Sequence, residues 1–211
     1  MERGALLVLE GCDRVGKSTQ TKRLVQALKD RDLKVEARGF PDRTTTIGSV
    51  IDEYLKYKKD LPRETIHLLF AANRWEQKDD IIKTLNSGIT LVVDRYAASG
   101  AAYSAASTNK HLVWGKSLDQ GLPAPDLVAF LSVNNEILSA RDGWAKERFE
   151  NQDFQKKVAE NFLQLKEDTW KIIEGNQSID DVHKILLEES LKVIQKVKTI
   201  PIKKLYENES N

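Results

Sequence analysis

The chain has 211 residues, of which 40% are hydrophobic and 31% are charged, and its formal net charge is +1. This length and composition predict one compact domain over residues 1–211. Because charges of both signs are interspersed, the chain lacks the basic balance of proteins that bind polymeric nucleic acid, and we expect no such partner.

A reducing compartment is indicated by the single cysteine, Cys12, which cannot form an internal disulfide. We therefore expect an intracellular protein, in the cytoplasm or also in the nucleus. The apolar runs have the length of strands rather than the roughly 20 residues of a membrane-spanning helix. The opening MERGALLVLEG also lacks the pattern of a secretory signal, so we expect no membrane partner.

Short apolar segments alternate with longer amphipathic ones, a pattern typical of parallel strands joined by crossover helices. Strands are predicted at 5–9, 34–40, 89–94, 127–133 and 170–175, and helices at 16–33, 63–86, 154–167 and 179–197. In the helix at 63–86, the predicted buried side comprises Leu68, Leu69, Ala72, Trp75, Ile82 and Leu85. The polar segment at 140–151 predicts a mobile flap, and the polar tail at 203–211 is expected to fray.

Residues 11–18, GCDRVGKS, fit the phosphate-binding pattern G-x-x-x-x-G-K-[ST] between a predicted strand and a predicted helix. Gly11 and Gly16 allow the backbone to turn so that its amides point at phosphate oxygens, and the helix adds its positive N-terminal end. Lys17 is predicted to reach the outer phosphates of a nucleoside triphosphate. The Ser18 hydroxyl is predicted to ligate a magnesium ion.

A second group of polar residues follows other strands. Asp94 ends a strand beside the P-loop, at the sheet edge where open α/β proteins bind ligands, so it can hold magnesium through water or orient an attacking oxygen. Arg95 and Arg43 provide two guanidinium groups, which favour a phosphate monoester as acceptor over water. A signalling GTPase is disfavoured, because Ala97 stands where it needs a glycine and TNKH at 108–111 lacks the aspartate of a guanine-binding motif.

Five segments resemble thymidylate kinases in their order and spacing, over almost the whole chain: LEGCDRVGKSTQ, FPDRTTTIG, LLFAANRWE, VDRYAASGAAY and GLPAPDLV. The resemblance implies a P-loop NTPase fold of the nucleoside-monophosphate-kinase type, a three-layer α/β/α arrangement around a five-stranded parallel sheet. It also implies transfer of the γ-phosphate of ATP to dTMP, giving dTDP and ADP for dTTP biosynthesis. Magnesium as cofactor and a homodimer are further implications, and the flap at 140–151 corresponds to the family's lid.

The resemblance also assigns the site residues. ATP would be bound by Gly11, Cys12, Asp13, Arg14, Val15, Gly16, Lys17, Ser18, Thr19 and Arg141, with Arg141 against the adenine. dTMP would be bound by Asp13, Phe40, Arg43, Phe70, Arg74, Arg95, Ser99, Gly100 and Tyr103. Catalysis is assigned to Arg14, Lys17, Asp94 and Arg95, and the magnesium to Ser18 and Asp94.

Several of these assignments are specific to one group of the acceptor. Phe70 would stack on thymine, and Arg74, one turn later on the same helix face, would donate to a carbonyl of its base-pairing edge. Tyr103 would occupy the space that a 2′-hydroxyl needs. As in eukaryotic-type members, Asp13 would accept a hydrogen bond from the 3′-hydroxyl and Arg14 would contact the phosphoryl group in flight.

The chain departs from the family at Phe149, where the ERYE motif has a tyrosine, so a contact of this position with the acceptor is put in question. Two interpretations of Arg148 stay open, a phosphate contact and a solvated position on the flap. Two other functions also stay open. A kinase of thymidine itself is disfavoured by the two acceptor-side arginines, and a non-catalytic nucleotide-responsive protein by the intact P-loop.

Overall fold

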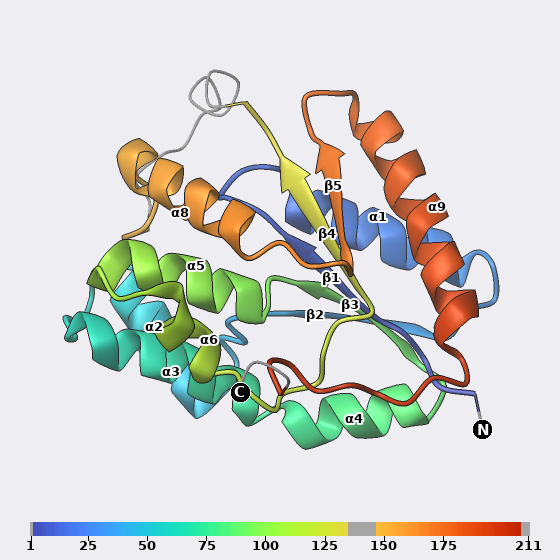
Figure 1. Ribbon diagram of the computed structural model, residues 1–211, viewed down its shortest axis with the longest axis horizontal. Coiled ribbons are helices and arrows are strands. Elements are labelled where there is room, and N and C mark those ends of the chain that lie inside the picture. The colour runs from blue at the N-terminus through green and yellow to red at the C-terminus, as the bar shows by residue number, and fades with distance from the viewer. Residues whose placement is uncertain (1, 135–146, 208–211) are drawn as a thin grey trace.

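A single parallel sheet forms the centre of the computed structural model, which describes residues 2–134 and 147–207 (Figure 1). Its strands are β1 (Leu6–Glu10), β2 (Val35–Gly39), β3 (Thr90–Asp94), β4 (Leu127–Ser132) and β5 (Trp170–Glu174). They are arranged in the order β2-β3-β1-β4-β5, and every pairing is parallel. The predicted five-stranded parallel sheet is thus confirmed.

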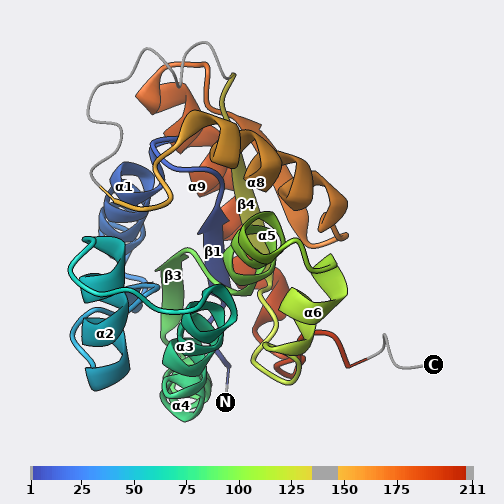
Figure 2. The ribbon, with the colours of Figure 1, turned by 90° about the vertical axis from the view of Figure 1, so that its left-hand side faces the viewer.

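Helices cover both faces of this sheet. They are α1 (Lys17–Lys29), α2 (Thr46–Leu55), α3 (Arg63–Trp75), α4 (Lys78–Asn86), α5 (Ala97–Thr108), α6 (Leu112–Ser117), α8 (Gln152–Gln164) and α9 (Ile179–Val197). Figure 2 shows α1 and α5 on opposite sides of β1, which gives the predicted three layers. Within the part of the chain that the structure covers, no helix combines the length and the apolar character that a bilayer crossing requires.

The central strand β1 contributes side chains to both cores. Leu7 packs in one buried cluster with Leu24 of α1, while Leu6 packs in another with Ile81 of α4. Successive side chains of a strand point to opposite faces, so a strand covered on both sides must be apolar throughout. This explains why the segment is a continuous apolar run instead of an alternating one.

The single helix predicted over 63–86 is wrong, because two helices occupy this range. α3 ends at Trp75 and α4 begins at Lys78. Two acidic residues, Asp79 and Asp80, lie in the first turn of α4, where negative charge stabilises a helix N-terminus. They give the second helix a start of its own, which apolar periodicity does not reveal.

The predicted buried side of α3 is also partly wrong. Leu68 is 50% exposed and Trp75 is 36% exposed, whereas the polar side chains His67, Asn73 and Arg74 are buried. Apolar periodicity finds the face that packs on a core. The inner face of α3 instead borders the candidate site, and Asn73 and Arg74 take buried positions there with polar partners from other segments.

The N-terminal segment meets the segment that follows α9 beside the first residues of β1 and β4. Arg3 donates two hydrogen bonds of 2.7 Å to the Asp126 carboxylate, which also accepts from the Leu6 amide at 2.8 Å. The Arg3 Nε donates to the Ile200 carbonyl at 2.5 Å. This ion pair therefore joins two strands to the C-terminal segment.

The expectation that the tail frays from residue 203 is wrong for its described part. Leu205 is 7% exposed, and its amide donates to the Leu122 carbonyl at 2.8 Å. The Gly121 amide donates in return to the Leu205 carbonyl at 3.0 Å. Ile202 and Tyr206 pack against the same buried cluster as Leu205, so apolar contacts and backbone bonds together dock the segment.

We expect Asp126→Asn to lower the free energy of unfolding by about 3 kcal/mol, because it leaves the buried Arg3 charge without its counterion. Urea unfolding followed by circular dichroism would measure the change. The control is Asp168→Asn, an exposed acid near β5, which should leave the midpoint unchanged. Equal midpoints for Asp126→Asn and the wild type would show that the pair does not stabilise the junction of these segments.

Candidate active site

A cavity of about 720 Å³ lies where β1, β2 and β3 end, bordered by the P-loop, α3, α5 and the segment 147–150. Open α/β sheets bind ligands at this edge. The predicted site residues that line it are Asp13, Arg14, Gly16, Lys17, Ser18, Thr19, Phe40, Arg43, Phe70, Arg74, Asp94, Arg95, Ser99, Gly100 and Tyr103. Gly11, Cys12 and Val15 are buried in the same loop. Arg141 lies outside the described residues.

The P-loop turns sharply between β1 and α1. Gly11 has a φ of 142° and Gly16 a φ of 99°, the left-handed region that favours glycine. A Cβ on Gly11 would also lie 2.6 Å from the Leu131 carbonyl oxygen of the neighbouring strand. Burial raises the pKa of Cys12 to about 11, so its thiol stays protonated and serves packing.

Lys17 lies under the loop with only 5% of its surface exposed. Its ammonium donates to the carbonyls of Gly11 and Cys12 at 3.1 and 2.6 Å. Burial, helped by repulsion from Arg95, lowers the pKa of Lys17 to about 8. Anionic phosphate oxygens beside the ammonium would stabilise its charged form.

Ser18 and Asp94 bring two oxygen donors together at the mouth of the loop. The Ser18 hydroxyl donates to the Asp94 carboxylate at 2.5 Å. Magnesium prefers oxygen ligands and commonly takes only one or two from the protein, the rest being phosphate oxygens and water. This donor pair fits that chemistry, and both residues line the cavity.

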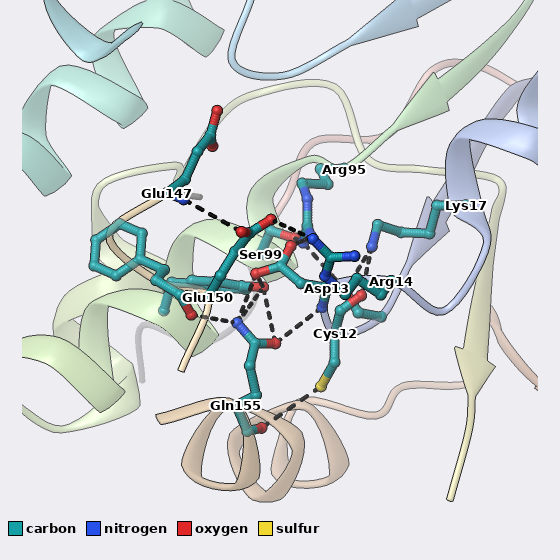
Figure 3. Close-up of polar contacts among 12 residues, drawn as sticks. Cys12, Asp13, Arg14, Lys17, Arg95, Ser99, Glu147, Glu150 and Gln155 are labelled. Carbon is teal, nitrogen blue, oxygen red and sulfur yellow. Dashed lines mark hydrogen bonds and ion pairs between the residues drawn. The ribbon is translucent and has the colours of Figure 1, made fainter. Parts of the chain in front are cut away.

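Asp13 and Arg95 connect the P-loop with the turn after β3 (Figure 3). Arg95 donates through Nη2 to the Asp13 carboxylate and through Nη1 to the Gly11 carbonyl at 3.1 Å. Its guanidinium carbon lies 5.2 Å from the centre of the Tyr103 ring, and the Tyr103 hydroxyl donates to Asp13 at 3.1 Å. The acid in the variable part of the loop thus fixes one of the two predicted phosphate-binding arginines.

Gln155 is a site residue that the sequence analysis missed. Figure 3 shows it reaching from α8 to the P-loop, where its side-chain oxygen accepts from the Asp13 amide at 2.9 Å. Its Nε2 donates to the Asp13 carboxylate at 2.6 Å and to the Phe149 carbonyl at 2.9 Å. The buried side-chain amide of Gln155 therefore fixes both the backbone and the side chain of Asp13.

Glu10 is a second missed residue, and it has no exposed surface. One carboxylate oxygen accepts from the amides of Tyr96 and Ser99 at 2.9 and 3.0 Å, and the other accepts from the Ser99 hydroxyl at 2.5 Å. Burial raises the pKa of Glu10, although these bonds and Arg95 oppose the shift. The acid at the end of β1 thereby satisfies donors at the start of α5 and sets the position of the turn that carries Arg95.

An aromatic wall borders the cavity opposite the P-loop. Phe149 packs with its ring centre 6.5 Å from Phe70, 5.9 Å from Tyr103 and 5.2 Å from Phe154. His67 stacks on Phe149 at 6.1 Å. An apolar phenylalanine suits this environment, in which a tyrosine hydroxyl would need a partner.

The cations at the cavity rim are paired with acids of the segment 147–150. The Arg43 guanidinium donates to Glu147 at 2.7 and 3.1 Å and to Asp52 at 2.6 Å. Arg14, whose φ is 66°, lies 3.4 Å from a Glu150 oxygen. In this structure both arginines therefore contact carboxylates where phosphates are predicted to bind.

Arg148 adopts neither of the two positions that the sequence left open. Its Nε donates to the Tyr54 carbonyl of α2 at 2.5 Å, and its guanidinium carbon lies 4.4 Å from the centre of the Tyr54 ring. It also pairs with Asp60. Here the residue anchors its segment to α2.

Comparison with known proteins decides the family. A family model described as "Thymidylate kinase" matches residues 9–186 of this chain. The chain belongs to the thymidylate kinase family.

Relatives and a solved structure agree with this membership over nearly the whole chain. Thymidylate kinase of Danio rerio is 44% identical over 207 residues, which cover 97% of this chain and 98% of the relative. Thymidylate kinase of Homo sapiens is 45% identical over 196 residues, covering 90% and 92%. The solved structure of thymidylate kinase from Candida albicans superposes with a TM-score of 0.88 at 37% identity, covering 97% of this chain and 99% of that chain. The predicted family and fold are thereby confirmed.

The family's motifs locate the residues that would touch substrates. They do not include the residues that hold these substrate-facing side chains in place. Glu10, Asp119 and Gln155 are buried polar residues whose partners lie far away in the sequence. Glu10 directly precedes the P-loop, which is the one signal available for it. For Asp119 and Gln155 the sequence offers none, because a polar residue in a loop or in the first turn of a helix is ordinary.

His67 gives a testable dependence on pH. It is 2% exposed, its Nε2 has no hydrogen-bond partner among the described residues, and burial, with help from Arg74, lowers its pKa to about 4. An unfolded histidine titrates near pH 6.5. Between these values the unfolded chain binds the extra proton, so the free energy of unfolding must fall as the pH falls.

Between about pH 6.5 and 4.5, the free energy of unfolding of the wild type should fall as the pH falls. We expect it to fall by roughly 2 kcal/mol less in His67→Leu, because this variant lacks the buried histidine. Urea unfolding at a series of pH values would measure it. His111→Gln, at an exposed histidine, is the control and should keep the slope of the wild type. Parallel curves for His67→Leu and the wild type would contradict a buried neutral histidine.

Proposed function

We propose that this chain is an ATP-dependent thymidylate kinase, which transfers the γ-phosphate of ATP to dTMP and gives dTDP and ADP. One observation carries the proposal: a single cavity joins a complete P-loop to a second set of cations and an aromatic wall. A P-loop by itself supports many reactions. A second phosphate site with an aromatic surface beside it supports a nucleoside monophosphate as acceptor.

The donor's phosphates would bind along the P-loop. Its amides and the N-terminal end of α1 provide donors for phosphate oxygens, and Lys17 adds a charge from below. Arg141, outside the described residues, is proposed to lie against the adenine. These groups position the γ-phosphate. Positioning and charge stabilisation are the main contributions of a protein to phosphoryl transfer.

The acceptor would lie across the aromatic wall. Phe70 is proposed to stack on the thymine, with Arg74 toward a base carbonyl, while Phe40, Ser99 and Gly100 shape the pocket around them. Arg43 and Arg95 are proposed to bind the acceptor's phosphate as bidentate forks. A phosphate would replace the Glu147 carboxylate on Arg43, since both bind the same guanidinium edge.

Asp13 retains capacity for a substrate hydroxyl. An ionised carboxylate offers about four lone-pair positions. The contacts from Arg95, Tyr103 and Gln155 use three of them. The remaining position supports the proposed hydrogen bond from the 3′-hydroxyl, with Tyr103 beside the sugar where a 2′-hydroxyl would otherwise lie.

Ser18 and Asp94 are the residues that we propose to hold magnesium, Asp94 partly through water. When bound, the ion would neutralise charge on the donor's phosphate oxygens. Arg14 and Arg95 would add positive charge around the phosphoryl group as it moves between donor and acceptor. No nucleophilic side chain is needed, because the acceptor's own phosphate oxygen attacks in line.

We also propose a homodimer that works in the cytoplasm or the nucleus. Leu68 on the outer face of α3, 50% exposed, supports a subunit contact there. An exposed leucine alone is common on monomers. The proposal therefore rests mainly on family membership.

Purified protein with ATP and magnesium should release ADP when dTMP is added, and remain at background with thymidine or buffer. A coupled assay for ADP measures all three in parallel. ADP release with thymidine but not dTMP would assign a nucleoside kinase, which the acceptor-side arginines disfavour. If ATP binds but neither dTMP nor thymidine causes ADP release, the chain would be a non-catalytic nucleotide-binding protein.

Arg14→Ala should lower kcat by about 10³-fold, because an arginine supplied in cis stabilises charge that develops only in the transition state. The KM for dTMP should change much less. Steady-state kinetics would measure both values, with Arg23→Ala as control, since Arg23 on α1 pairs with Asp180 at the surface. A kcat within about tenfold of the wild type would remove Arg14 from this role.

A further inference from the structure

Arg74 is bound by the carboxylate of Asp119. The distances from Nε to Oδ1 and from Nη2 to Oδ2 are both 2.8 Å, so the contact is bidentate. Arg74 is 3% exposed and Asp119 has no exposed surface. Because this geometry fixes two nitrogens of a planar group, it fixes the plane of the whole guanidinium.

The other edge of the guanidinium is left for the cavity. In the part of the chain that the structure describes, the Arg74 guanidinium makes no hydrogen bond apart from those to Asp119. Arginine has five N–H donors, and the pair uses two of them. Arg74 lines the cavity one helical turn after Phe70, so its remaining donors lie beside the surface proposed to stack on the base.

Gly100 provides the space for this pair. A Cβ on Gly100 would lie 2.9 Å from the Arg74 Cζ, closer still to Nη2, and 3.1 Å from an Asp119 oxygen. Real Cβ atoms essentially never show contacts under 3.0 Å, so the guanidinium would have to shift. Gly100 therefore does more than shape the floor of the pocket, because any larger residue would displace the guanidinium.

The backbone around Asp119 is itself held in place. The Trp75 indole of α3 donates to the Leu118 carbonyl at 2.7 Å, and the Asp119 amide donates to the Lys116 carbonyl at 3.1 Å. The Gly121 amide donates to the C-terminal segment. A carboxylate on so constrained a turn can set the direction of a longer, more flexible arginine side chain.

We propose that Asp119 is a positioning residue for base recognition: it holds one edge of Arg74 so that the free N–H donors face a carbonyl oxygen of the pyrimidine. This inference rests on the proposed function, in which Arg74 faces the base of the acceptor. N–H donors in a fixed position can hydrogen-bond to the carbonyl oxygen of a 4-keto base. They cannot do so with a 4-amino base, because its exocyclic amino group is itself a donor. Asp119 thereby selects a 4-keto base over a 4-amino base without touching it.

Three ligands with different groups at position 4 of the base test the proposal. They are dTMP, 5-methyl-dCMP with an amino group there, and the dTMP analogue with hydrogen there. Only the 4-keto base carries a proton on N3, so each variant is compared with the wild type for the same ligand, which cancels that second difference. Calorimetric titration of the wild type and Asp119→Asn measures each affinity. We expect Asp119→Asn to weaken dTMP by about 10- to 100-fold and the hydrogen analogue by less than about threefold, so that selectivity for the keto base is lost.

Gly100→Ala is the second variant, because it displaces the guanidinium without removing a charge and alanine is compatible with a helix. It should give the same selective loss, and it decides the question if Asp119→Asn does not fold. Asp168→Asn, at an exposed acid, is the control and should leave all three affinities unchanged. Titration with ATP reports separately on the P-loop and should give equal affinities in all variants.

Equal weakening of the three acceptor ligands in the variants would overturn the inference, because it would show a structural role. The proposed function would then still stand, since the wild type binds dTMP. A wild type that binds ATP and not dTMP would overturn both. The two failures are therefore distinguishable in one set of titrations.

Discussion

The cavity must hold five cationic side chains close together, some buried and some at its rim, and this constraint organises the structure around it. Charges buried without partners are costly. Each cation is therefore matched by an acceptor from another element: Arg14 by Glu150, Lys17 by P-loop carbonyls, Arg43 by Glu147 and Asp52, Arg74 by Asp119, and Arg95 by Asp13. The acidic partners at the rim can be exchanged for phosphates, and the partners in the interior stay in place. Together they allow the cavity to keep the positive potential that phosphates require.

These partners divide into two groups by their burial. Asp119 is fully buried, and Asp13 is fixed by the buried Gln155 and by Tyr103, so both act as permanent supports. Glu147 belongs to the lid predicted over 140–151, and it meets Arg43 where Arg43 is 39% exposed. An exposed ion pair contributes little net stability. A phosphate can therefore take the place of Glu147 at small cost, whereas the interior arginines keep their orientation throughout.

Sequence reasoning predicted the sheet, the P-loop and the residues that line the cavity, because each has a local signal: an apolar run, a glycine spacing or a family motif. It failed at the inner face of α3, where polar residues such as Asn73 are buried by partners distant in the sequence. It also missed Gln155 and Asp119, since nothing in their neighbourhood shows what they will contact. Local pattern predicts which groups meet the substrate, and only the tertiary structure shows what aligns them.

The docked C-terminal segment has a consequence for anyone who makes this protein in the laboratory. The last residues, KKLYENESN, read as a dispensable polar tail. Leu205, however, bonds through its backbone to Gly121 and Leu122, in the turn that begins with the carboxylate behind Arg74. A clone trimmed for crystallisation before residue 205 would release that turn while leaving the P-loop intact. Such a truncated enzyme could still bind ATP and be mistaken for one that discriminates poorly among bases by nature.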